Sequence, residues 1–233
     1  MKLNRILSSV ALSALLASPA AAQRQFDITT KPGAPVQSTM YGIFFEDINF
    51  GADGGLYAEM VENRSFEFPN RLMGWNVWGN VSVSSLKPAF DRNPNYVVLE
   101  PSGHREKSTG LEIRGFFGMG LKKGMKYNFS VYGRLHLLNG KQAKIRVELV
   151  DENNNPMERK SITITNNQWK KYSVELTSKQ TLQKGYMRIF LEGNESVDLD
   201  HVSMFPADNW NGLRADLVKD LEDLHPGIFR FPG

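Results

Sequence analysis

Residues 143–165 read AKIRVELVDENNNPMERKSITIT, and this stretch decides the fold class. Apolar and polar residues alternate over 143–149, a polar cluster at 151–156 is typical of a turn, and a strand pattern resumes at 161–165. Alternation with a period of two places one strand face on a core and the other in water, as in antiparallel sheets. The stretch therefore predicts successive strands of an antiparallel all-β domain.

The same pattern continues on both sides of this stretch. Many short strands at close spacing predict an antiparallel, jelly-roll-like β-sandwich, which we place at residues 67–206. Beyond the two strands above, its expected strands cover residues 127–132, 169–176, 185–191 and 197–205.

The segments that flank the sandwich have a different pattern. Residues 40–45, MYGIFF, form a nearly continuous apolar run, which predicts a strand buried on both faces. A loop at 51–55 and a short helix over 56–63 are expected to follow. Near the other end, apolar residues at helical spacing predict a helix over 213–224, with Asn211 as its N-cap, and then a second buried strand at 228–231.

A strand, a helix and a second strand that are split by an all-β insert are typical of the start of an α/β domain. A (β/α)₈ barrel needs about 250 residues. We therefore expect residues 23–66 and 207–233 to open a barrel that is truncated here, with its remainder beyond residue 233. The alternative is that the last helix packs on the sandwich as a lid.

The first 22 residues have the layout of a signal peptide. Lys2 and Arg5 precede an apolar run over 6–17, and small residues lead to an expected cleavage after Ala22. The alternative is a buried N-terminal helix. We expect a periplasmic or extracellular protein without a membrane anchor.

Composition excludes several other classes of protein. The 233 residues contain no cysteine, which excludes disulfides, thiolate metal sites and a thiol nucleophile. The net charge is only +3 and both signs are intermixed, so we expect no nucleic-acid partner.

Several motifs together resemble the opening of glycoside hydrolase family 51, a family of α-L-arabinofuranosidases. They are MYGIFFEDIN at 40–49, GGLYAE at 54–59, NRSFE at 63–67, NGLRADL at 211–217 and FRFPG at 229–233. The middle resembles the carbohydrate-binding sandwich that is inserted near the start of many members, at 125–132, 169–172 and 197–203. One departure is His201, where many relatives have a second acid.

The resemblance implies a secreted, retaining hydrolase that removes terminal non-reducing α-L-arabinofuranosyl groups from arabinan or arabinoxylan. Retention needs two carboxyl groups roughly 5 Å apart. In this family both glutamates lie on later barrel strands, so we expect them beyond residue 233 and assign no catalytic residue. The rival interpretations are a non-catalytic carbohydrate-binding module and an adhesion or scaffolding sandwich without a sugar ligand. The glycan and the oligomeric state stay open.

The resemblance also implies four site residues. Glu46, at the end of the first barrel strand, and Arg230, in the second, are expected to bind the substrate; the alternative is an ordinary ion pair for each. Glu67 and Asp200 match positions that hold structural calcium in some related modules, and hard oxygen ligands suit that cation. The alternative is a solvated or salt-bridged pair. No cofactor is required for the reaction.

Tryptophans are further candidates for contact with sugar. Trp75, Trp78, Trp169 and Trp210 can each stack on a sugar ring or pack within the sandwich. Trp75 and Trp78 lie just after the entry to the insert, where we expect one of them to be exposed.

Overall fold

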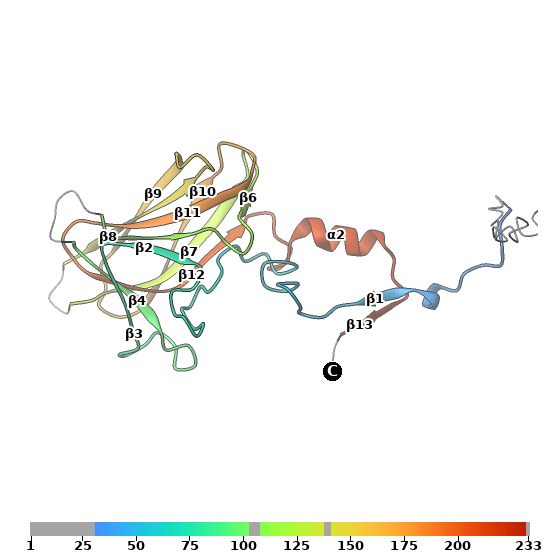
Figure 1. Cartoon of the computed structure of the whole chain (residues 1–233), viewed down its shortest axis with the longest axis horizontal. Coiled ribbons are helices and arrows are strands. Elements are labelled where there is room, and N and C mark those ends of the chain that lie inside the picture. Colours follow the sequence, from blue (N-terminus) through green and yellow to red (C-terminus); the bar gives the residue numbers. More distant parts are fainter. Residues whose placement is uncertain (1–30, 103–107, 138–140, 232–233) are drawn as a thin grey trace, which may run out of the picture. The chain divides into compact units, whose positions relative to one another are not determined.

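The computed structural model describes residues 31–102, 108–137 and 141–231. The chain divides into two units, Met1–Met40 and Tyr41–Gly233. In the first unit the described residues include a short 3-10 helix, η1 (Ser38–Met40). The second unit contains two antiparallel sheets, a separate pair of parallel strands and one described α-helix (Figure 1). The expected signal peptide, residues 1–22, lies outside the described residues.

The first sheet of the sandwich has five strands, and every neighbouring pair is antiparallel. A register shift between Asp200 and Ser203 interrupts one of these pairings. The strands follow one another across the sheet in the order β10 (Lys170–Thr177), β7 (Lys126–Leu135), β12 (Val197–Pro206), β4 (Tyr96–Glu100) and β3 (Asn80–Ser84).

The second sheet has six strands and contains the stretch from which the fold class was predicted. Residues 143–165 form its neighbours β8 and β9, which pair antiparallel with Ile145 opposite Ile162. The strand order is β2 (Trp75–Trp78), β5 (Gly110–Ile113), β11 (Leu182–Glu192), β8 (Ala143–Val150) and β9 (Pro156–Ile164), with β6 (Met119–Leu121) also paired to β11.

The core lies between the two sheets and consists of one face of each. Phe129 and Val131 of β7 and Ile145 and Val147 of β8 are completely buried, while the residues between them are polar or small and face outward. Burial of alternate apolar side chains stabilises a sandwich, because each removes its apolar surface from water. The predicted β-sandwich is confirmed.

The two flanking strands, β1 (Gly42–Phe44) and β13 (Ile228–Arg230), pair in parallel, with Gly42 opposite Ile228. A side chain at position 42 would lie only 2.3 Å from the Ile228 carbonyl oxygen, so the pairing requires glycine there. Phe44 is 56% exposed and Ile228 is also exposed, whereas the sequence predicts strands buried on both faces. Within the described residues no layer covers this pair and no barrel closes, so the barrel stays a prediction.

Helix α2 (Ala215–Asp223) confirms the helix expected near the end of the chain, but its expected N-cap is wrong. The cap is Arg214, in extended conformation without a side-chain hydrogen bond, and Asn211 lies in the preceding turn. No described helix is both long enough and apolar enough to cross a membrane.

The helix expected over residues 56–63 is also wrong. This segment is bonded to distant parts of the chain, with Ala58 N donating to Gly212 O and Met60 N to Met204 O. These tertiary hydrogen bonds replace the bonds that a helix would form within itself.

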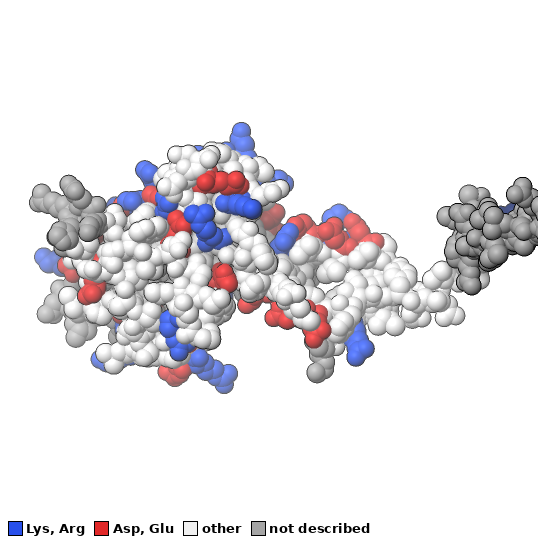
Figure 2. Space-filling view, viewed as in Figure 1, with Lys and Arg blue, Asp and Glu red and all other residues white. Residues whose placement is uncertain are grey.

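Charge is mixed over the surface of the sandwich. In the view of Figure 2, lysines and arginines lie among aspartates and glutamates, and no broad area of the sandwich carries one sign. Such a surface suits a ligand without a large net charge.

Candidate functional site

The outer face of the six-stranded sheet carries a row of polar side chains that crosses five strands, and four of the five are charged. Strand register aligns Asn76 of β2, Glu112 of β5, Arg188 of β11, Glu148 of β8 and Arg159 of β9. Arg188 Nε lies 3.0 Å from Glu112 Oε2, and Arg159 Nε lies 3.0 Å from Glu148 Oε1. Acids and bases therefore alternate across the sheet, so each carboxylate is held in place by its neighbours.

Both carboxylates of this row are almost completely buried. Glu112 is 3% exposed and also receives hydrogen bonds from Asn76 and Arg114. Glu148 is bonded by Arg146 Nε at 2.9 Å as well as by Arg159. A buried carboxylate loses its contacts with water, and hydrogen bonds from arginine and asparagine side chains offset that cost. Because several partners fix each carboxylate, the row is a pre-organised set of polar groups.

A second row beside the first presents aromatic rings. Trp78 of β2 and Phe190 of β11 flank Gly110 of β5 in register, and their rings stack with centroids 5.8 Å apart at 22°. Gly110 permits this contact, because a side chain there would lie 2.7 Å from Phe190 Cδ1. Trp78 is 37% exposed. The guanidinium of Arg188 lies over its ring at 5.7 Å, and that of Arg146 lies over Phe190 at 5.0 Å.

We call this surface, made of the aromatic pair Trp78 and Phe190 with Arg146, Arg188 and Glu112, the sheet-face platform. The exposed part of the Trp78 ring can pack on the C–H face of a sugar ring, and flanking arginines and carboxylates bond hydroxyl groups as donors and acceptors. The arrangement is suited to binding a ligand. Sequence reasoning named Trp78 but missed the other members, because only strand register brings them together.

The other three tryptophans have different surroundings. Trp75 is in the core, and its indole N–H donates to Asn63 O at 3.1 Å. Trp169 donates to Lys87 O and packs beneath the guanidinium of Arg134, 4.5 Å from its ring centroid. Trp210 is exposed, in the turn before α2. The expectation that one of Trp75 and Trp78 is exposed is thus confirmed for Trp78.

The predicted substrate ligands Glu46 and Arg230 lie at the same end of the parallel pair. Arg230 is the last residue of β13 and pairs with Phe44, two residues before Glu46. Both side chains are exposed, and the Arg230 guanidinium lies over the Phe44 ring at 5.4 Å. Nothing in the described residues tests whether they bind a sugar, so these roles stay predictions.

The predicted calcium ligands Glu67 and Asp200 lie close enough for the charge of Glu67 to affect Asp200. Burial, and secondarily that charge, raises the pKa of Asp200 to about 7. Asp200 is completely buried; its Oδ1 accepts from His201 N at 2.6 Å, and its Oδ2 has no hydrogen-bond partner in the described part of the chain. Glu67 accepts a 2.8 Å hydrogen bond from Asn95 N.

The oxygen atoms of Glu67 and Asp200 are of the type that binds a hard cation, but two residues supply fewer ligands than calcium needs. An unpartnered buried carboxylate oxygen beside a second carboxylate suits calcium, which prefers six to eight oxygen ligands. Among the described residues, however, no three acidic, histidine or cysteine side chains gather at one point. Backbone carbonyls or water would have to complete the coordination.

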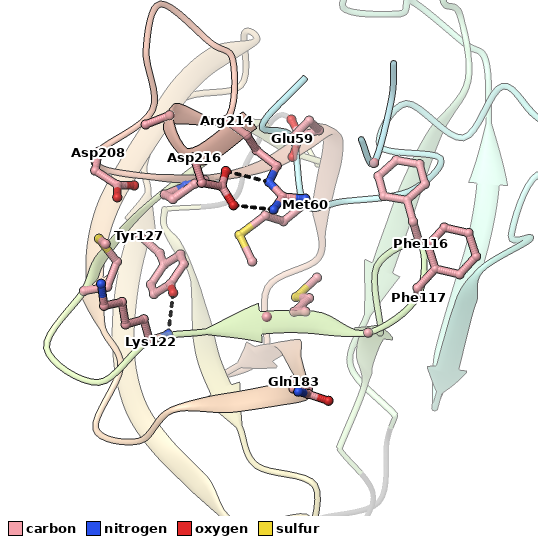
Figure 3. A pocket seen from close by; sticks show the side chains of 17 residues that line it. Glu59, Met60, Phe116, Phe117, Lys122, Tyr127, Gln183, Asp208, Arg214 and Asp216 are labelled. Atoms are coloured by element: carbon pink, nitrogen blue, oxygen red, sulfur yellow. Dashed lines mark hydrogen bonds and ion pairs between the residues drawn. The ribbon is translucent and has the colours of Figure 1, made fainter. Parts of the chain in front are cut away.

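A separate pocket of about 510 Å³ lies at one edge of the sandwich (Figure 3). Its lining comes from residues 54–60, from the loop before β6 and β6 itself, from the starts of β7 and β11, from the end of β12 and the segment after it, and from the first residues of α2. Glu59, buried beside it, accepts hydrogen bonds from Ser203 Oγ at 2.7 Å and Met204 N at 2.9 Å. Burial raises the pKa of Glu59 above its ordinary range.

Comparison with known proteins finds a matching family and several relatives that are longer than this chain. The family described as "Carbohydrate binding domain" matches residues 58–197. An extracellular exo-α-L-arabinofuranosidase of Streptomyces chartreusis is 37% identical over 89% of this chain and 26% of its own length. Alpha-L-arabinofuranosidase 1 of Arabidopsis thaliana is 29% identical over 90% of this chain and 33% of its own length.

A solved structure agrees with the sequence relatives. An arabinose-bound α-L-arabinofuranosidase designated MgGH51 is similar with a TM-score of 0.73 and 25% identity, over 88% of this chain and 36% of the other. The resemblance to the α-L-arabinofuranosidases of glycoside hydrolase family 51 is thus confirmed. The chain spans about a quarter to a third of the length of the relatives it matches.

Proposed function

This chain belongs to the carbohydrate binding domain family through residues 58–197, and on that premise we propose that it binds a polysaccharide on its sheet-face platform. The observation that carries the proposal is the stacked pair Trp78 and Phe190, set in a lattice of buried carboxylates and arginines. A neutral sugar chain suits this surface, because a sugar ring can pack on the aromatic pair while the fixed polar groups form hydrogen bonds with the sugar hydroxyls.

The proposed ligand is an arabinose-containing plant polysaccharide. Relatives that span this chain are named α-L-arabinofuranosidases, and one carries arabinose in its solved structure. We infer that the platform holds the polysaccharide while hydrolysis of terminal α-L-arabinofuranosyl groups belongs to a catalytic barrel with two glutamates. For that barrel, Glu46 and Arg230 are the proposed substrate ligands. The proposed location of the protein is periplasmic or extracellular.

A structural calcium ion between Glu67 and Asp200 is a second proposal. The ion would satisfy the Asp200 oxygen that has no partner in the described residues and would fasten β12 to the segment before β2.

Binding of soluble arabinan and arabinoxylan to the chain, measured by calorimetry, tests the platform. We expect Trp78→Ala to weaken binding by about tenfold or more, as is typical for a buried aromatic anchor of an interface. Trp210→Ala, which removes an exposed indole elsewhere, is the matched control and should leave binding unchanged. Equal affinity of wild type and Trp78→Ala, or the absence of binding to either polysaccharide, would overturn the proposal.

A further inference from the structure

The pocket of Figure 3 is lined on one side by aromatic rings that project from a tight loop. Phe116 and Phe117 lie between Gly115 and Gly118, whose φ angles of 70° and 102° require glycine. Phe117 is 71% exposed. The ring of Phe50 packs against both, with centroids 5.3 Å from Phe116 and 5.7 Å from Phe117. A large apolar ring that is fixed in water beside a cavity is typical of a ligand site.

Polar side chains line the rest of the pocket, and several are not engaged elsewhere. In Figure 3, Asp208 and Lys122 lie on the side away from the two phenylalanines, and Gln183 lies below the pocket in this view. None of these three side chains forms a hydrogen bond or ion pair within the described residues. They are therefore available as donors and acceptors for a ligand with many hydroxyl groups.

The charges of the pocket balance, which argues against an ionic ligand. Arg214 is bonded to Asp216 through Nε at 3.1 Å and Nη2 at 2.5 Å, so its charge is already compensated. Glu59, the third acid of the lining, is buried and lies 3.3 Å from Arg64 Nη1, which stands outside the lining. Lys122 and Asp208 offset one another as the remaining exposed charges. An anion would find one free base, Lys122, and a cation one free carboxylate, Asp208, so the wall favours neither sign.

We propose that this pocket is a second carbohydrate site, which takes one or two neutral sugar units with Phe117 as its stacking surface. The pocket volume of about 510 Å³ falls in the range of small-ligand sites and is too small for a long segment of chain. The pocket lies at an edge of the sandwich, beside the first turn of α2, and it shares no lining residue with the sheet-face platform. It therefore does not depend on the function proposed for the platform.

The chain provides a substitution that fills the pocket without strain. Gly120 lines it within β6, and a Cβ there would meet no heavy atom within 4 Å. Its backbone is not in the left-handed region, so a side chain is tolerated. Gly120→Phe should occupy the cavity, and Phe117→Ala should remove the stacking surface with little effect on stability, because the ring is exposed.

The test is a titration of the isotope-labelled 233-residue chain with arabinobiose, xylobiose or cellobiose, followed by backbone amide NMR shifts. We expect at least one disaccharide, at up to about 50 mM, to shift the amides of residues 117–122 and 183 in wild type. Gly120→Phe and Phe117→Ala should each weaken this response by about tenfold or more. Trp210→Ala and Trp78→Ala should leave it intact.

The outcomes separate the two sites. A response at residues 117–122 that survives Trp78→Ala supports the pocket, whatever happens on the platform. No shift at these amides with any of the three sugars overturns the pocket, as does a response that persists unchanged in both Phe117→Ala and Gly120→Phe. Shifts that are confined to the amides around Trp78 and Phe190 would uphold the platform alone.

Discussion

Replacing Glu112 by alanine should destabilise the sandwich and disorder its sheet-face platform at the same time. The Glu112 carboxylate accepts the hydrogen bond of Arg188 Nε at 3.0 Å, and Arg114 Nη2 also lies 3.0 Å from it. The Arg188 side chain is only 13% exposed. Glu112→Ala therefore leaves a largely buried guanidinium without its counter-charge.

The expected loss follows from that burial. Removing one partner of a buried ion pair costs about 3–5 kcal/mol in the free energy of unfolding. For a domain of this size, that loss lowers Tm by roughly 6 to 20 °C. The exposed pair of Lys126 and Glu175, 2.9 Å apart, provides the matched control. Glu175→Ala should cost less than about 1 kcal/mol, because water screens that pair.

A double variant separates stability from binding. Glu112→Leu combined with Arg188→Met replaces the pair by apolar side chains of similar size, which is often neutral for stability. We expect near wild-type unfolding by urea, yet weaker polysaccharide binding, since Arg188 no longer lies over Trp78. A loss below about 1 kcal/mol for Glu112→Ala would refute the reasoning, because the row of charges would then not hold buried groups in place.

Three further predictions concern other groups. Burial raises the pKa of Glu59, so its contribution to stability is present at low pH and is lost as pH rises from 4.5 through the pKa of the folded state. Glu59→Gln should flatten the fall in unfolding free energy over that range, and an unchanged slope would contradict this prediction. Calcium should raise Tm more at about pH 8 than at about pH 5, because Asp200 must be ionised to bind the ion, and Asp200→Asn should abolish the effect. An identical Tm in calcium and in chelator at the higher pH would rule out a calcium ion at this site. In an enzyme that carries the whole barrel, Glu46→Ala or Arg230→Ala should lower kcat/KM on a nitrophenyl arabinofuranoside by about tenfold or more, and unchanged kinetics in a stably folded variant would remove both residues from the substrate site.

The strands that sequence predicted best are those with strict alternation. Residues 143–149 became β8 with bounds within one residue, because the alternation reports directly which side chains face the core. Residues 197–205 became β12 with similar bounds, although burial does not alternate there and the register shifts between Asp200 and Ser203. Shorter strands such as β5 and β6 were not named individually, since three or four residues carry too little periodicity. The helix expected over 56–63 failed because tertiary hydrogen bonds to Gly212 and Met204 took its backbone groups.

Sequence by itself determined the class of the sandwich and the family, because alternation is local and the motifs are contiguous. Only the tertiary structure decided the candidate sites. Glu112 and Arg188 are 76 residues apart, and register across β5 and β11 brings them into contact. The pocket likewise joins the loop before β6 to the start of α2. Such contacts depend on which strands become neighbours, and a single sequence fixes that order only through the packing of the whole core.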